Sequence, residues 1–141
     1  MCGFAGGMWL HSVIPDPVAT GQAMIQQIRH RGPDDSGVWC DDRAGIMLAH
    51  ARLSIVDLSP AGHQPMLSAC GRYVIAFNGE IYNHLSLRQA LGSQVAYRGH
   101  SDTETLLAAC AAWGVEATLQ KLVGMFALAL WDCEQEVLYL A

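Results

Sequence analysis

The residue pattern with the clearest chemistry stands at the start of the sequence, where MCGFAGG places a cysteine at position 2. Once the initiator methionine is removed, Cys2 carries a free α-amine beside its thiol. A free thiol has a pKa of about 8.5 and an α-amine one of about 7.7–8.0, so the amine can accept the thiol proton near neutral pH. An N-terminal residue can therefore act as a nucleophile with its own amine as the base. The alternative interpretation is that this cysteine is accidental and only packs.

The other cysteines and the histidines indicate no metal site or disulfide framework. The total of five cysteines is odd, their spacing is wide and no CxxC occurs. Three of them have apolar neighbours and are predicted to be small buried side chains: Cys70, Cys110 and Cys133. The six histidines, at 11, 30, 50, 63, 84 and 100, show no ligand spacing. A second hypothesis stays open, in which Cys2 belongs to a thiol hydrolase and one of these histidines is its base.

Composition limits the classes of protein to which the chain can belong. The 141 residues are 52% hydrophobic and 15% charged, which favours one domain with a packed core. A net charge of −5 without a basic cluster argues against nucleic acid as a partner. The longest uncharged apolar stretch, 122–131, is shorter than the about 20 residues that cross a bilayer. No basic residue precedes Arg29, so a secretory signal is disfavoured, and a reducing cytoplasm is expected.

Hydrophobic periodicity and turn residues predict six strands and four helices. Strands are expected at 4–10, 36–40, 45–53, 72–78, 125–131 and 137–141, and helices at 16–29, 84–92, 101–114 and 115–122. Asp16 and Pro17 have the pattern of an N-cap and first turn, and Val18, Ile25 and Ile28 mark one helical face. SDTE at 101–104 has the form of a capping box. Met24, Met47, Met66 and Met125 are predicted to fill the core. Strands that pair locally favour antiparallel sheets with helices packed outside them, an α+β fold.

Further motifs follow MCGFAGG in a specific order. They are RHRGPDDSG (29–37), HARLSIVDLSPAGHQPM (50–66), FNGEIYNH (77–84), SDTE (101–104) and GMFALALWD (124–132). In this order and spacing the sequence resembles the class II glutamine amidotransferases, specifically the glutaminase domain of glutamine-hydrolysing asparagine synthetases. The resemblance spans residues 1–141 and implies the N-terminal-nucleophile hydrolase fold, a four-layer α/β/β/α sandwich of two antiparallel sheets. The family's domain continues through an RD-containing turn and further strands, and VLYLA ends on an apolar run. We therefore expect a fragment truncated at its C-terminus.

The resemblance also implies a role for individual residues. Cys2 would attack the carboxamide of L-glutamine, and Arg52 would bind its α-carboxylate, because a guanidinium fork suits a planar carboxylate. The backbone of Leu53, Ser54, Ile55 and Val56 would lie alongside the substrate. Asn78 and Gly79 would form the oxyanion hole through a side-chain and a backbone N–H. Glu80 and Asp102 would hold the α-ammonium, and the turn at 32–34 would support the pocket.

Three of these assignments have a structural alternative that the residues leave open. The alternative for Arg52 is a side chain that lies at the surface or closes a hairpin. The Asn-Gly pair at 78–79 follows an apolar strand and is a standard type I′ hairpin signal. Asp102, at the first position of a predicted helix, also compensates the helix dipole.

The activity that the resemblance implies is that of a carbon–nitrogen ligase. Glutamine is hydrolysed to glutamate and ammonia, which a covalently linked synthetase domain uses with ATP to amidate aspartate to asparagine. ATP and Mg²⁺ are expected in that domain, whose SGGxDS motif does not occur in this chain, and no cofactor or metal is expected here. A homodimer is a further expectation, and a membrane is not an expected partner.

Two alternative functions remain. An amidotransferase of the same family can pass ammonia to another acceptor, a sugar or polysaccharide or a peptide-like precursor. HARLSIVD and NGEIYN disfavour glucosamine-phosphate synthase and the purine amidotransferase, whose forms differ. The other alternative is non-enzymatic, a fragment or a decayed domain kept as an assembly module. The presence of Cys2, Arg52, Asn78, Gly79 and Asp102 together weighs against decay.

Overall fold

The computed structural model describes residues 2–9, 14–55, 57–93 and 95–141. Within these ranges the strands are β1 (Gly3–Met8), β2 (Asp35–Asp41), β3 (Ile46–Arg52), β4 (Met66–Leu67), β5 (Tyr73–Ile81), β6 (Gly124–Asp132) and β7 (Val137–Leu140). The α-helices are α1 (Pro17–Ile28), α2 (His84–Leu91), α3 (Asp102–Trp113) and α4 (Val115–Leu119). Two short 3₁₀ helices follow α1 and precede β4: η1 (Arg29–Arg31) and η2 (Pro60–Gly62).

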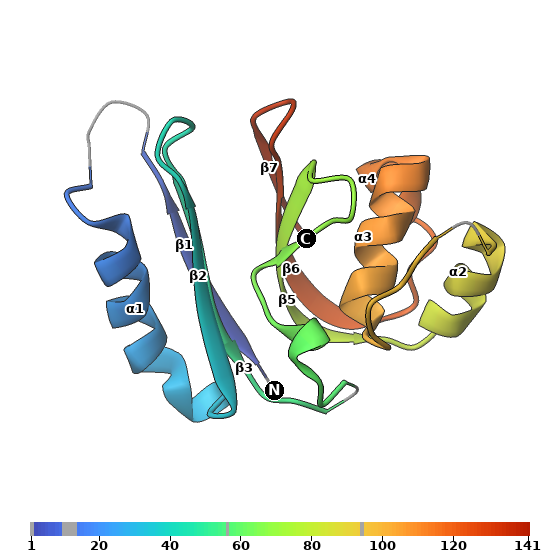
Figure 1. Ribbon diagram of the computed structural model, residues 1–141, viewed down its shortest axis with the longest axis horizontal. Coiled ribbons are helices and arrows are strands. Elements are labelled where there is room, and N and C mark those ends of the chain that lie inside the picture. The colour runs from blue at the N-terminus through green and yellow to red at the C-terminus, as the bar shows by residue number, and fades with distance from the viewer. Residues whose placement is uncertain (1, 10–13, 56, 94) are drawn as a thin grey trace.

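The elements form four layers (Figure 1). The first sheet has the order β1-β3-β2 and the second has the order β4-β5-β6-β7, and every pairing is antiparallel. Helix α1 covers the outer face of the first sheet, and α2, α3 and α4 lie on the outer side of the second (Figure 1). The predicted α+β class and the α/β/β/α sandwich are therefore confirmed.

Apolar side chains fill the three spaces between the layers. Between α1 and the first sheet lie Ile25, Met47, Ala49 and Ala51. Between the two sheets lie Ile46, Leu48, Val74, Ala76, Ala129 and Trp131. The third cluster joins the second sheet to its helices and includes Ile75, Phe77, Leu106, Leu107, Leu128 and Leu130. Strand β3 is buried on both faces, which explains why its sequence is almost continuously apolar.

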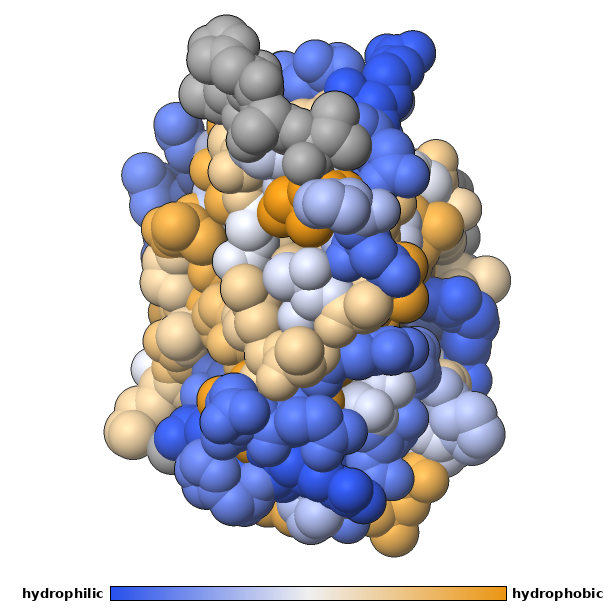
Figure 2. Space-filling view, turned by 90° about the vertical axis from the view of Figure 1, so that its left-hand side faces the viewer, coloured by the Kyte–Doolittle hydropathy of each residue, from blue (hydrophilic) through white to orange (hydrophobic). Residues whose placement is uncertain are grey.

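Helix α1 begins as its sequence predicts. The Asp16 side chain accepts a hydrogen bond from the Ala19 N–H at 2.8 Å, and Pro17 is the first helical residue. Ile25 is buried against the first sheet, but Val18 is 46% exposed, so the predicted apolar face does not extend to the first turn. Figure 2 views the molecule from this side and shows mainly apolar and neutral side chains across its middle, above a hydrophilic lower end.

Helix α3 begins with half of the predicted capping box. The Glu104 N–H donates to Ser101 Oγ at 3.2 Å, as a serine N-cap requires. The Glu104 carboxylate does not return to Ser101. It accepts the N–H groups of Arg98 at 2.8 Å and of Gly99 at 2.9 Å. Glu104 therefore fixes the loop that leads into the helix and, with it, the position of the first helical residue.

The strand predicted to end at Asn78 continues through Gly79 to Ile81. Asn78 pairs with Ala127 and Gly79 with Phe126, so the hairpin interpretation of the Asn-Gly pair is wrong. The long partner strand β6 overrides the local turn preference. Gly79 has φ 148°, a conformation that side chains rarely adopt, and a Cβ there would overlap the backbone of β6.

Other boundaries shift by a few residues. Strand β1 covers 3–8 rather than 4–10, and position 10 of that prediction lies outside the described residues. The helix predicted at 115–122 ends at Leu119, and the two-residue strand β4 was not predicted. None of the helices in the described ranges is long and apolar enough to cross a membrane.

The predicted burial of the cysteine and methionine side chains is confirmed only in part. Cys110 is 1% exposed, as expected, but Cys70 is exposed because it lies in the turn between β4 and β5, and Cys133 is half-buried after β6. Among the methionines, Met47 and Met66 are buried in the core. The predictions for Met24 and Met125 are wrong, because these side chains are 36% and 70% exposed on α1 and at the start of β6.

Candidate active site

Strand alternation brings the candidate residues to one end of the sandwich. On β3, Ile46 and Leu48 face the second sheet, so Arg52 lies on the same face four residues beyond Leu48. On β5, Val74 and Ala76 face the first sheet, so Asn78 and Glu80 follow on that face. Because Gly3 pairs with Ala51, the start of β1 brings Cys2 beside the end of β3.

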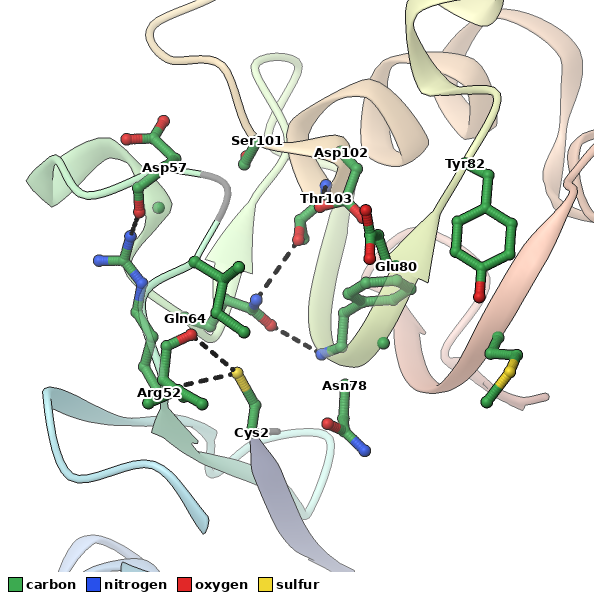
Figure 3. A pocket seen from close by; sticks show the side chains of 16 residues that line it. Cys2, Arg52, Asp57, Gln64, Asn78, Glu80, Tyr82, Ser101, Asp102 and Thr103 are labelled. Atoms are coloured by element: carbon green, nitrogen blue, oxygen red, sulfur yellow. Dashed lines mark hydrogen bonds between the residues drawn. The ribbon is translucent and has the colours of Figure 1, made fainter.

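A cavity of about 190 Å³ opens where these residues meet (Figure 3). Its lining combines the predicted site with residues that were not predicted. It consists of Cys2, Arg52, Leu53, Ile55, Asp57, Gly62, Gln64, Phe77, Asn78, Gly79, Glu80, Tyr82, Ser101, Asp102, Thr103 and Met125.

The Cys2 thiol is held against the backbone that follows β3. The Leu53 N–H donates to Cys2 Sγ at 3.3 Å, and the thiol lies 3.5 Å from the Leu53 carbonyl oxygen. The Cys2 carbonyl accepts a hydrogen bond from Arg31 Nε at 2.9 Å. In the part of the chain that the structure describes, no hydrogen bond joins Cys2 to a histidine. The geometry thus gives no support to a Cys–His pair.

Arg52 is buried in the cavity wall, with 7% of its surface exposed. Its guanidinium donates to the carbonyl of Ser59 at 3.1 Å and to the carbonyl of Asp57. A Cβ at Gly62 would overlap the guanidinium, so a glycine is required for this approach. The loop between β3 and β4 therefore fixes the arginine, and the alternative of a surface arginine is wrong. The alternative of a hairpin-closing arginine agrees with one contact, because Arg52 Nη1 lies 3.8 Å from Oδ2 of Asp35, its partner across β2 and β3.

Asp57 connects the arginine loop to the loop before α3. Its carboxylate accepts the Ser59 N–H at 2.8 Å and the His100 N–H at 2.8 Å, while its carbonyl binds Arg52. Hydrogen bonding, first from the Ser59 side chain and then from the His100 and Ser59 backbone, lowers the pKa of the Asp57 carboxyl to about 2. Asp57 was not predicted as a site residue, although it stands within the HARLSIVDLSPAGHQPM motif.

The two carboxylates predicted to bind an ammonium lie across the cavity from Arg52 (Figure 3). Asp102 is the first residue of α3 and is 5% exposed. Its carboxylate accepts the Thr103 N–H and the Ile81 N–H, each at 2.9 Å. Asp102 therefore binds the first turn of α3 and also the edge of β5. Glu80 is exposed on β5 and lines the same side.

One of the two predicted oxyanion donors, the Gly79 N–H, lies on an open edge of β5. The N–H groups of Phe77 and Ile81 point away from β6, since they donate to the side chains of Gln64 and Asp102. Alternation along the strand places the Gly79 N–H on the same edge, between these two. Asn78 is half-buried, and its Oδ1 is buried without a hydrogen-bond partner among the described residues.

Of the residues predicted to lie along the substrate, Leu53 and Ile55 line the cavity. Ser54 does not line the cavity, and its N–H donates to Asp34 Oδ2 at 2.8 Å. Val56 lies outside the described residues. The Asp34 N–H donates to the Arg52 carbonyl at 3.0 Å, so the turn at 32–34 does support the wall of the pocket.

His50 is a buried residue behind the cavity that sequence reasoning did not single out. It is 0% exposed, and its Nε2 lies 2.9 Å from the Phe77 carbonyl oxygen, so this nitrogen carries the hydrogen. Its Nδ1 is buried without a partner in the described ranges. Burial lowers the pKa of His50 to about 4. Among the described residues no group of three or more metal-ligating side chains gathers here or elsewhere.

Two facing antiparallel sheets, covered by helices and holding a cysteine beside the first strand, define a sandwich of the N-terminal-nucleophile hydrolase type. The family model of the glutamine amidotransferase domain matches residues 1–141, and the chain belongs to this family.

Curated relatives agree with this assignment. Asparagine synthetase B [glutamine-hydrolyzing] of Escherichia coli is 48% identical over 109 residues, which cover 77% of this chain and 19% of the relative. Asparagine synthetase [glutamine-hydrolyzing] 1 of Bacillus subtilis is 40% identical over 142 residues, covering 99% of this chain and 22% of the relative. Amidase chry2 of Gibberella zeae is 33% identical over 150 residues, covering 100% of this chain and 22% of the relative. The chain thus spans about a fifth of the length of these relatives.

Proposed function

We propose that this domain hydrolyses glutamine to glutamate and ammonia, with Cys2 as the nucleophile. The observation that carries the proposal is the arrangement around the thiol. The sulfur lies in a cavity with a fixed cation, Arg52, on one side and two carboxylates, Glu80 and Asp102, on the other (Figure 3). A zwitterionic amino acid has the complementary charges. Bound between these groups, glutamine would extend its side chain toward Cys2.

In the proposed complex, Arg52 binds the α-carboxylate of glutamine. The guanidinium has five N–H donors in a planar fork, and the carbonyls of Asp57 and Ser59 hold that fork in place. Asp102 and Glu80 bind the α-ammonium. Because the Asp102 carboxylate is already fixed by two backbone N–H groups, little side-chain entropy is lost on binding.

The proposed chemistry begins at the processed N-terminus. The Cys2 α-amine accepts the thiol proton, and the sulfur forms a bond to the carboxamide carbon. The oxyanion of the tetrahedral intermediate is stabilised by the Asn78 side-chain amide and the Gly79 N–H. When the intermediate collapses, the carbon–nitrogen bond breaks and the protonated amine returns its proton to the departing nitrogen. Ammonia and a glutamyl thioester result, and water then hydrolyses the thioester to glutamate and the free thiol.

We further propose that the intact protein is a glutamine-hydrolysing asparagine synthase. A covalently linked synthetase domain would receive the ammonia and amidate aspartate with ATP and Mg²⁺. The names of the Escherichia coli and Bacillus subtilis relatives support this acceptor. No cofactor is proposed for residues 1–141. A cytoplasmic location and a homodimer remain part of the proposal.

A second candidate is an amidotransferase of the same family with a different ammonia acceptor. The amidase from Gibberella zeae supports it, because that relative covers the whole chain and does not carry the asparagine synthetase name. Asparagine formation and ammonia transfer to a sugar or peptide-like precursor both need the same glutaminase step, so the acceptor is decided outside this chain.

The test is glutamate release from glutamine by the intact protein, compared with its Cys2→Ala variant. The proposal predicts release by the wild type and none above background by the variant. Equal release by both proteins would show that Cys2 is not the nucleophile. A variant with an unprocessable residue before Cys2 separates the mechanisms: it should be inactive if the α-amine is the base and active if a histidine is. If the wild type releases no glutamate, the non-enzymatic alternative is favoured.

A further inference from the structure

Strand β5 has an edge that its neighbour β4 covers only at one end. Strand β4 consists of two residues, and it pairs Met66 with Ile75 and Leu67 with Val74. Toward Asn78 no strand among the described residues continues this pairing. Backbone N–H groups beyond Ile75 on this edge therefore need partners other than a strand, since a buried unpaired N–H is unfavourable.

Gln64 stands where the next strand residue would be. Continuing the β4 register by two residues places Gln64 opposite Phe77. Its side chain replaces the missing backbone partner, because Oε1 accepts the Phe77 N–H at 2.7 Å. Gln64 is 6% exposed and lines the cavity. The neutral amide thus lies directly between the end of β4 and the proposed oxyanion donors.

The same amide also reaches the start of α3. Gln64 Nε2 donates to Thr103 Oγ1 at 3.4 Å (Figure 3). Thr103 follows Asp102, whose carboxylate binds the Ile81 N–H. Gln64 and Asp102 therefore bind the β5 edge on either side of Gly79. The Gly79 N–H lies between the two bonded N–H groups, and its direction depends on how firmly both are held.

We propose that Gln64 is a positioning residue for glutamine hydrolysis, which aims the Asn78 and Gly79 donors at the carbonyl that Cys2 attacks. This inference rests on the function proposed above. Gln64 acts through the backbone of β5 and does not need to touch the reacting atoms. Its loss should slow the chemical step far more than it weakens glutamine binding, because the bonds that hold the Arg52 guanidinium and the Asp102 carboxylate do not involve Gln64.

The experiment compares three variants of the intact protein by steady-state glutamate release and by thermal unfolding. Gln64→Met keeps the length and apolar stem but removes both hydrogen bonds. Gln64→Glu keeps an acceptor for the Phe77 N–H and covers the case in which the methionine variant does not fold. Ser68→Ala is the matched control, because Ser68 Oγ accepts the Tyr73 N–H at 2.9 Å near the other end of β5 and Ser68 is also 6% exposed.

For Gln64→Met we expect kcat to fall about 10- to 100-fold with KM for glutamine within about twofold of wild type. Gln64→Glu should have a kcat between that of the wild type and that of Gln64→Met. Ser68→Ala should lower the unfolding temperature and leave kcat unchanged. Wild-type kcat in both Gln64 variants, or an equal fall of kcat in Ser68→Ala, would overturn the positioning role. Absence of glutamate release by the wild type would instead overturn the proposed function, and the positioning role with it.

Discussion

Leu53 and Cys2 hold each other across the junction of β1 and β3: the Leu53 N–H donates to the cysteine sulfur at 3.3 Å, and its carbonyl lies 3.5 Å from the same atom. Leu53 follows Arg52 directly in sequence. The backbone that carries Arg52, the residue proposed to bind the substrate carboxylate, therefore continues directly into the peptide groups that hold the proposed nucleophile.

The first prediction concerns the oxyanion donors. Asn78→Ala should lower kcat for glutamine hydrolysis about 100- to 1,000-fold, because one donor to the developing negative charge is lost. Stability should change by less than about 1 kcal/mol, since the Asn78 Oδ1 has no partner among the described residues. Steady-state kinetics and chemical unfolding measure the two effects.

Asn83→Ala is the matched control for this prediction. The Asn83 side chain bonds the Lys121 carbonyl at 2.9 Å and the Val123 N–H at 3.0 Å, outside the cavity. This variant should lose stability and keep its kcat. If Asn78→Ala hydrolyses glutamine at the wild-type rate, the oxyanion assignment is wrong.

The second prediction concerns the arginine fork. Arg52→Lys should raise KM for glutamine about 10-fold or more, because a single ammonium cannot reproduce the planar contacts of a guanidinium. It should also lower the unfolding free energy by about 1–3 kcal/mol through the lost bonds to the Asp57 and Ser59 carbonyls. Arg43→Lys, at a side chain that is 90% exposed, is the control and should change neither quantity. An unchanged KM in Arg52→Lys would exclude Arg52 from substrate binding.

The third prediction is a pH dependence of stability that originates from His50. Burial lowers the pKa of this imidazole to about 4, below its ordinary value of about 6.5. Between these values the unfolded chain binds a proton that the folded protein does not, so the unfolding free energy falls as the pH falls. The contribution of His50 is complete above about pH 6.5 and is lost as the pH approaches about 4.

Urea unfolding at a series of pH values measures this effect. A His50→Gln variant should show a smaller loss of stability between about pH 6.5 and 4 than the wild type, because the titrating group is gone. His30→Gln, at an exposed histidine, should keep the wild-type slope. Identical slopes in wild type and His50→Gln would show that another group governs the acid response.

How far the sequence predicts the site depends on the kind of contact that each residue makes. Cys2, Arg52, Asn78 and Asp102 stand in ordered motifs, and the fold brings all four to one cavity. Local preference misleads at the Asn-Gly pair, because the hydrogen bonds that keep it extended come from β6, about 50 residues later in the chain. A turn signal cannot contain that information.

Gln64 and His50 were not predicted from the sequence for a related reason. Each binds the backbone of Phe77, at the N–H and the carbonyl respectively, and a backbone partner leaves no signature in side-chain patterns. Met125 was predicted to lie in the core from its apolar strand, yet it stands where β6 extends past the covered part of the sheet and reaches the cavity. Strand pattern predicts the face on which a residue lies, whereas burial depends on where the opposing layer ends.

Mass spectrometry of the acid-quenched, active protein during glutamine turnover tests the central claim most directly. The account predicts a chain that begins at Cys2 and carries one glutamyl group, mapped to Cys2 by peptide analysis. Active protein that retains its initiator methionine, or a glutamyl group on any other residue, would contradict it.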